Sequence, residues 1–122
     1  MKATDILSDF GKEFINKVRD CTLSDFEMIV TGKMKSEEAL SLHKKIMSLS
    51  PENMVILKEV VKNIIDRELF NILNFFEQSD EYLISHIDND TYINLNELSD
   101  GLAGELYSDN GWIAKYSEFK DL

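Results

Sequence analysis

Cysteine, proline and glycine are scarce in this chain. Among its 122 residues there are one proline, five glycines and one cysteine. So few helix-breaking residues favour long helices over the turn-rich architecture of β-sandwiches and barrels. Because Cys21 has no second cysteine with which to pair, an internal disulfide is excluded. We expect Cys21 to pack as a small apolar core residue of a cytoplasmic protein.

Long uncharged apolar runs are missing as well. No segment approaches about 18 consecutive apolar residues, so no membrane span is expected. The chain enters a charged amphipathic segment directly after Met1 and Lys2, which argues against a signal peptide. Hydrophobic residues nevertheless make up 43% of the chain, which is enough for a core. The length fits one helical domain over residues 1–122.

Basic residues become rare in the last third of the chain. Residues 1–76 carry 12 acidic and 11 basic side chains, whereas residues 77–122 carry 11 acidic side chains and only two basic ones. Nearly all of the formal net charge of −10 therefore belongs to the second segment. Such a surface repels nucleic acid and anionic membranes, and it attracts basic proteins. The alternative is a face that serves only solubility.

The segment from about 50 to 77 predicts a long helix. Ser50 is a favoured N-cap and Pro51 suits the first helical position. Apolar residues then recur with a helical period and cover most of the circumference, a pattern typical of a buried helix. We therefore expect an all-α fold, with five to six helices packed around this central helix. The residues of its main apolar stripe are Met54, Leu57, Val61, Ile64, Ile65, Leu69, Ile72, Leu73 and Phe76.

Further helices are expected on both sides of the central one. Periodicity predicts one over about 4–20, a second that begins at Thr22 or Ser24, and a third that is capped by Ser36. Another is expected over about 96–107.

The C-terminal segment is expected to be less regular. We expect a turn at 86–91 and a short helix or strand at Trp112–Tyr116. If that segment is a strand, it could form a short hairpin with Tyr92–Leu95. We expect Trp112 to close the core and the chain from Ser117 onward to be frayed.

The sharpest local motif is HIDNDTYINLNEL, which runs from His86 to Leu98. It resembles the calcium-binding loop of EF-hand proteins, because Asp88, Asp90 and Glu97 fall on ligand positions 3, 5 and 12. It departs from that loop at position 1, where His86 is a poor ligand for a hard cation. It departs again at position 6, where Thr91 replaces glycine. The alternative is an acidic turn that leads into a helix.

No catalytic or transition-metal motif has recognisable spacing. His43 and His86 lie in different segments, and neither a second cysteine nor a His-Glu-x-x-His pattern is present. A phosphate-binding loop and a basic patch for nucleic acid are also missing. We therefore predict that the chain is not an enzyme and that it uses no cofactor or metal.

Aromatic residues alternate with acids in the second half of the chain. This composition is typical of protein interfaces, in which Tyr and Trp side chains anchor the partner and charged side chains guide its approach. We predict a partner-binding surface made of Asp88, Asp90, Tyr92, Glu97, Asp100, Glu105, Tyr107 and Asp109.

In general character the chain resembles the small acidic bacterial immunity proteins of toxin–immunity pairs, of the contact-dependent inhibition or colicin type. The resemblance implies a protein-binding inhibitor that neutralises a basic partner, such as a nuclease toxin, in the cytoplasm. Two alternatives stay open. One is a helical scaffold or regulatory domain that acts by self-association, and the other is a degenerate calcium-responsive module. The oligomeric state is left open between monomer and homodimer.

Overall fold

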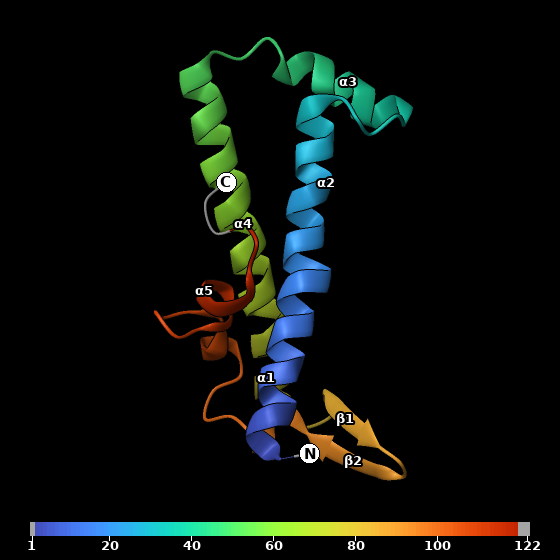
Figure 1. The fold of residues 1–122 in the computed structure, drawn as a ribbon, viewed down its shortest axis with the longest axis vertical. Helices are drawn as coiled ribbons and strands as arrows, with labels where there is room; N and C mark the ends of the chain where they lie inside the picture. Colours follow the sequence, from blue (N-terminus) through green and yellow to red (C-terminus); the bar gives the residue numbers. More distant parts are fainter. Residues whose placement is uncertain (1, 120–122) are drawn as a thin grey trace.

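The computed structural model describes residues 2–119 and is mostly helical (Figure 1). Its longest element is helix α4, Pro51–Gln78, which confirms the helix predicted over about 50–77. The hydroxyl of Ser50 accepts a hydrogen bond from the backbone N–H of Asn53 at 3.1 Å, and Pro51 lies in the first turn. The predicted helix start is therefore correct. At about 1.5 Å per residue, α4 is about 40 Å long.

The first third of the chain forms one continuous rod. It consists of α1, Ala3–Phe14, a π-helical segment η1, Ile15–Arg19, and α2, Asp20–Thr31. The expected break near residue 20 is therefore wrong. The wider π-turn inserts an extra residue into the helical repeat, and the backbone hydrogen bonds continue through it. This change of register turns Arg19 toward the interior, where its exposed fraction is 0%.

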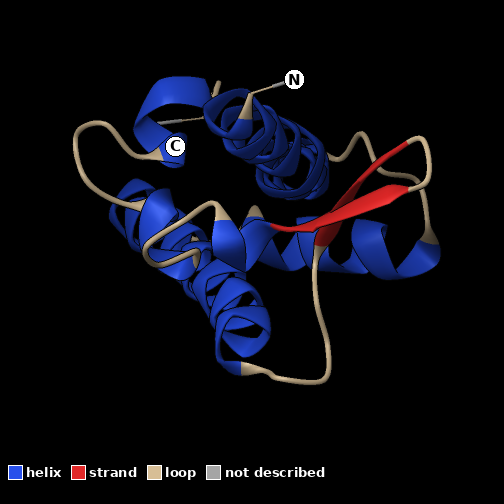
Figure 2. Ribbon diagram, turned by 90° about the horizontal axis from the view of Figure 1, so that it is seen from below, coloured by secondary structure: helices blue, strands red, loops and turns tan. Residues whose placement is uncertain are grey.

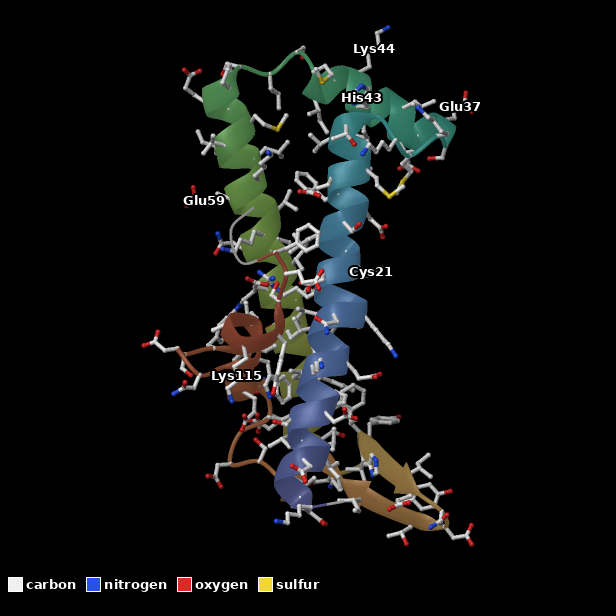
Figure 3. All side chains as sticks on the ribbon, in the orientation of Figure 1. Cys21, Glu37, His43, Lys44, Glu59 and Lys115 are labelled. Carbon is white, nitrogen blue, oxygen red and sulfur yellow. The ribbon has the colours of Figure 1, made fainter. Side chains whose placement is uncertain are left out.

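Helix α3, Glu37–Ile46, crosses the end of this rod. Gly32 ends α2 with a φ of 76°, a left-handed conformation that glycine adopts without strain. Ser36 caps α3 as predicted, because its hydroxyl accepts a hydrogen bond from the N–H of Ala39 at 3.2 Å. His43 lies over the end of α2, with its Nδ1 2.9 Å from the carbonyl oxygen of Val30 (Figure 3). This contact joins His43 of α3 to the end of α2.

The hydrophobic core lies at the end of the molecule where α1 and the second half of α4 approach each other. Leu69 and Leu73 are the buried residues of α4. The expectation of a nearly buried central helix is wrong, since Ile56, Val60 and Ile64 are 57%, 52% and 64% exposed. The first half of α4 diverges from α2 (Figure 1), and the side chains of these three residues stay exposed. The buried residues of this core are Ile6, Ile15, Leu69, Leu73, Leu95, Leu102, Ala103, Leu106 and Trp112.

A two-stranded antiparallel sheet follows α4. Strand β1, Ser85–Asp88, pairs with β2, Thr91–Asn94, so that His86 lies opposite Ile93. The turn between them uses Asn89 with a φ of 55°, a conformation that asparagine tolerates better than most residues. Figure 2 shows this hairpin extending from the helical body. Strand β2 therefore pairs with β1 and not with Trp112–Tyr116, which forms the short helix α5, one of the two forms expected for that segment.

The helix expected over about 96–107 is also wrong. Two 3₁₀ segments, η2 at Leu95–Glu97 and η3 at Ala103–Leu106, stand in its place. Between them the hydroxyl of Ser99 accepts a hydrogen bond from the N–H of Gly101 at 3.1 Å. This local bond favours a turn over a continuous helix. The structure confirms that Trp112 is buried in the core.

The chain from Ser117 to Phe119 is held rather than frayed. The Ser117 hydroxyl is buried and donates to Asp20 Oδ1 at 2.7 Å, and the N–H of Glu118 donates to Asp20 Oδ2 at 2.9 Å. The rest of the predicted tail, residues 120–122, lies outside the described residues.

Cys21 is exposed on α2 (Figure 3), so the prediction of a core cysteine is wrong. The register change at η1 directs the neighbouring Arg19 and Asp20 inward instead. Within residues 2–119, no helix combines the length and the apolar composition needed to cross a membrane.

Candidate functional site

Five of the eight residues predicted to bind a partner lie on two opposite sides of the molecule. Asp88, Asp90 and Tyr92 lie exposed on the hairpin. Tyr107 and Asp109 belong to the connection between η3 and α5. Figures 1 and 2 both show the hairpin and this connection projecting in opposite directions. One flat partner surface therefore cannot contact both groups at once.

The remaining predicted residues belong to η2, to η3 and to the loop that joins these two segments. Glu97 and Asp100 are exposed, in η2 and in the loop that follows it. Glu105 is half-buried, and its Oε1 accepts a hydrogen bond from the Ser99 hydroxyl at 2.9 Å. Glu105 therefore contributes to the loop structure, whereas Glu97 and Asp100 are free to face a partner.

Tyr107 is engaged with α4. Its hydroxyl donates to the carbonyl oxygen of Asp66 at 3.2 Å, and its ring lies 5.9 Å from that of Phe70 between centroids. Partial burial, followed by the nearby negative charge of Asp66, raises the pKa of the Tyr107 hydroxyl above its usual value. With 41% of its surface exposed, Tyr107 is only partly available as an anchor for a partner.

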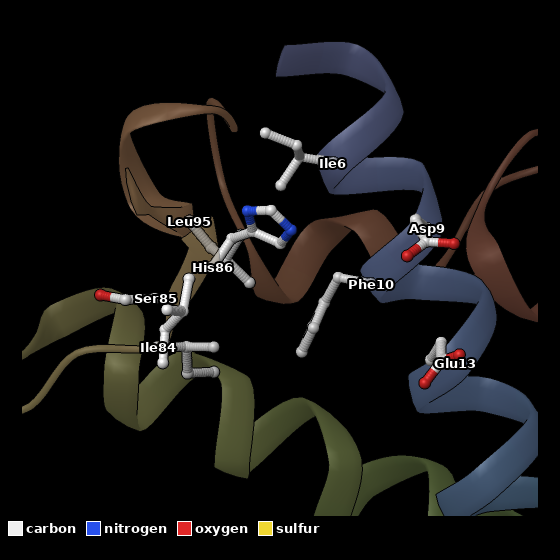
Figure 4. Close-up of a pocket in the computed structure, with 9 residues that line it drawn as sticks. Ile6, Asp9, Phe10, Glu13, Ile84, Ser85, His86 and Leu95 are labelled. Atoms are coloured by element: carbon white, nitrogen blue, oxygen red, sulfur yellow. The ribbon is translucent and has the colours of Figure 1, made fainter. Parts of the chain in front are cut away.

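A pocket of about 320 Å³ lies between α1 and the hairpin (Figure 4). Apolar side chains from α1, from strand β1 and from the chain on either side of the hairpin form much of its lining. Three ionisable side chains, Asp9, Glu13 and His86, complete it. The lining residues are Ile6, Asp9, Phe10, Glu13, Ile84, Ser85, His86, Ile87 and Leu95.

The α1 wall of this pocket is acidic. Asp9 and Glu13 are one helical turn apart, so both carboxylates project from the same face of α1. Glu13 Oε2 accepts a hydrogen bond from Lys17 Nζ at 2.8 Å, and this contact raises the pKa of Lys17. Asp9 takes part in no ion pair among the described side chains. Its charge is therefore available to a ligand.

His86 reaches into the same region from β1. Figure 4 shows its ring extending from the hairpin toward α1, the helix that carries Asp9 and Glu13. Its Nδ1 is buried and has no hydrogen-bond partner within the part of the chain that the structure describes. A buried polar atom without a partner costs about 1–3 kcal/mol, so such atoms concentrate where another group completes the arrangement.

Asp9, Glu13 and His86 are the residues that the sequence pattern did not single out together. The i, i+4 acidic pair beside Ile6 and Phe10 was a visible signal, but acidic pairs on helices usually belong to solvated faces. Only the packing of the hairpin against α1 brings His86 to them.

The EF-hand alignment implies a loop entered and left by helices. The segment instead folds as a tight hairpin in which Asp88 pairs with Thr91, and Glu97 lies beyond it in η2. Among residues 2–119, no group of three or more His, Cys, Asp or Glu side chains lies close enough together to hold a metal ion.

Comparison with known protein families, curated proteins and solved structures found no match to this chain.

Proposed function

We propose that this chain is a protein-binding inhibitor that neutralises a basic partner, as the immunity protein of a nuclease-type toxin does. The observation that carries the proposal is the acidic, partly apolar pocket between α1 and the hairpin. The exposed carboxylates of Asp88 and Asp90 lie on that hairpin and extend the negative surface beyond the pocket.

Two physical effects, on the rate of association and on the rate of dissociation, support an acidic inhibitor of a basic protein. A negative surface accelerates encounter with a basic protein and suppresses contact with polyanions. Exposed aromatic and aliphatic groups then slow dissociation, and here Tyr92 and Ile87 are exposed on the same hairpin. A nuclease must present a basic surface to its substrate, so an acidic inhibitor can cover that surface directly.

The proposal is tested by affinity capture from the native host, with washes at low and then high salt. A single basic protein retained in stoichiometric yield is the expected result. Asp88→Lys combined with Asp90→Lys should then slow association at least about tenfold, with a weaker dependence on salt. Asp109→Lys, on the opposite side, is the control, and the effects are compared per reversed charge. Equal effects of the two sets of charge reversals would show that the hairpin side is not the interface.

The outer face of α4 favours self-association as a second candidate function. Ile56, Val60 and Ile64 are spaced four residues apart and form one exposed apolar stripe. We propose a second copy of this chain as the occupant of that stripe. Residues 1–76 are nearly neutral, whereas residues 77–122 carry almost all of the charge. An antiparallel pairing of two α4 helices keeps the two acidic ends of such a dimer apart.

Analytical ultracentrifugation over a range of protein concentrations tests this second proposal. We expect a monomer–dimer equilibrium that Val60→Lys abolishes while the melting temperature of the monomer is retained. Glu59→Lys, one position away on the exposed surface of α4, controls for added charge. A monomer at all concentrations, up to about millimolar, would contradict the dimer.

A further inference from the structure

We propose that the pocket between α1 and β1 is a receptor for one arginine side chain of the basic partner. This inference rests on the proposed function and specifies which chemical group the site recognises. It is carried by the combination of an apolar lining, an acidic wall and a buried histidine nitrogen that lacks a partner among residues 2–119.

The apolar part of the lining fits the stem and the flat face of an arginine. Ile6, Ile84 and Ile87 offer aliphatic surface for the three methylene groups of the stem. The ring of Phe10 offers an aromatic surface on which a guanidinium plane can stack. The volume of about 320 Å³ is at the lower end of ordinary ligand pockets, so it suits a single side chain.

The acidic wall supplies the charge that a guanidinium requires. Asp9 offers a carboxylate that is engaged in no ion pair with another described side chain. Glu13 Oε2 is held by Lys17, which leaves the other oxygen of Glu13 for a second contact. Two carboxylates one helical turn apart match the several donors of a guanidinium better than the single charge of an ammonium group.

His86 supplies the third element. Its Nδ1 is buried without a partner in the described part of the chain, so no hydrogen bond from those residues holds the ring at that nitrogen. In the proposed complex, a half-turn about the Cβ–Cγ bond exchanges Nδ1 with Cδ2 and brings this nitrogen to the guanidinium. A guanidinium N–H can then donate to the neutral ring, which removes the cost of the unpaired atom.

The test uses the whole chain labelled with ¹⁵N and titrated with Nα-acetyl-L-arginine methylamide. The citrulline methylamide is the matched neutral probe, since it preserves shape and removes the charge. We expect saturable shifts of backbone amide signals confined to residues 6–13 and 84–95. Binding of the citrulline probe should be at least about tenfold weaker. Equal affinity for the two probes, or shifts elsewhere only, would overturn the inference.

Two variants distinguish the effect of the acidic wall on binding from the effect of the overall charge of the protein. Asp9→Asn should weaken binding of the arginine probe about three- to tenfold, since its carboxylate is exposed and partly screened. Asp25→Asn, which removes another exposed carboxylate, on α2, should leave the affinity unchanged. Equal losses in both variants would mean that only the overall charge matters. Tighter binding of the corresponding lysine methylamide would refute the choice of arginine.

The same variants distinguish failure of this inference from failure of the proposed function. If captured basic partner binds the Asp9→Asn, Glu13→Gln double variant as tightly as it binds the unmodified chain, the arginine receptor is refuted and the inhibitor function stands. If no basic partner is captured while the arginine probe still binds at the pocket, the site is supported and the inhibitor function fails.

Discussion

Nε of Arg19 donates a hydrogen bond of 2.6 Å to Oδ1 of Asp66, and this bond joins the π-helical segment to α4. The guanidinium is fully buried and also donates through Nη1 to the Ser117 hydroxyl at 2.7 Å and to the Phe119 carbonyl at 3.0 Å. Three segments that are remote in sequence therefore meet at one cation. A buried charge is tolerated in such a site only because its donors are paired.

Replacing Arg19 should destabilise the fold strongly. Arg19→Met removes the cation and leaves the carboxylates of Asp20 and Asp66 without their partner in a poorly solvated site. We expect a loss of about 3–5 kcal/mol in the free energy of unfolding, measured by urea denaturation. Lys12→Met, at an exposed position of α1, should change it by no more than about 0.5 kcal/mol. A similar small change for Arg19→Met would show that the buried network contributes little net stability.

Gly11 is required by the close approach of Trp112. A Cβ atom at position 11 would overlap the indole ring, whereas a Cβ at Gly104 would meet no atom within 4 Å. Alanine favours a helix by about 1 kcal/mol relative to glycine. We nevertheless expect Gly11→Ala to lower the free energy of unfolding by about 1–3 kcal/mol, because the core cannot accept the added volume. Gly104→Ala should be nearly neutral. Tryptophan fluorescence should shift only in Gly11→Ala, and an unchanged spectrum there would contradict the predicted contact.

The two halves of α4 should respond differently to truncation. Leu69→Ala removes a buried side chain and should cost about 2–5 kcal/mol. Ile64→Ala, at a position that is 64% exposed, should cost less than about 1 kcal/mol when unfolding is measured on the monomer. The comparison is made by thermal and urea unfolding at low protein concentration. Comparable losses at both positions would mean that the outer stripe is covered within the folded monomer.

The raised pKa of the Tyr107 hydroxyl predicts that the folded protein loses stability at alkaline pH. Its pKa is raised in the folded state, so the folded protein holds the phenolic proton more tightly than the unfolded chain does. The resulting stabilisation is complete below the ordinary tyrosine pKa of about 10 and is lost as pH rises through the higher folded value. As pH rises from about 9.5 to 11.5, we expect the melting temperature of Tyr107→Phe to fall less steeply than that of the unmodified protein. Parallel curves for the two proteins would contradict this assignment.

Local signals in the sequence predicted some features well. The caps at Ser36 and Ser50 follow from short-range hydrogen bonding, and the long helix follows from its apolar period. The burial of Trp112 also agrees with its expected place in the core. These features depend on residues only a few positions apart, or on hydrophobicity alone.

Other predictions failed where remote contacts outweighed local pattern. The π-turn at η1 directs Arg19 inward and leaves Cys21 exposed, and nothing in residues 15–21 alone specifies that register. The apolar circumference of α4 predicted burial on most sides. The remaining elements cover only part of it, because the C-terminal segments pack against its second half.

The sequence by itself determined the helical character, the position and length of α4, and the concentration of negative charge after residue 76, because composition and local periodicity encode these properties. Tertiary structure alone decided that Asp88 and Asp109 lie on opposite sides, and that Asp9, Glu13 and His86 line one pocket. The physical reason is chain topology. The hairpin returns to α1 across more than seventy residues of sequence, and only core packing fixes which of their faces meet.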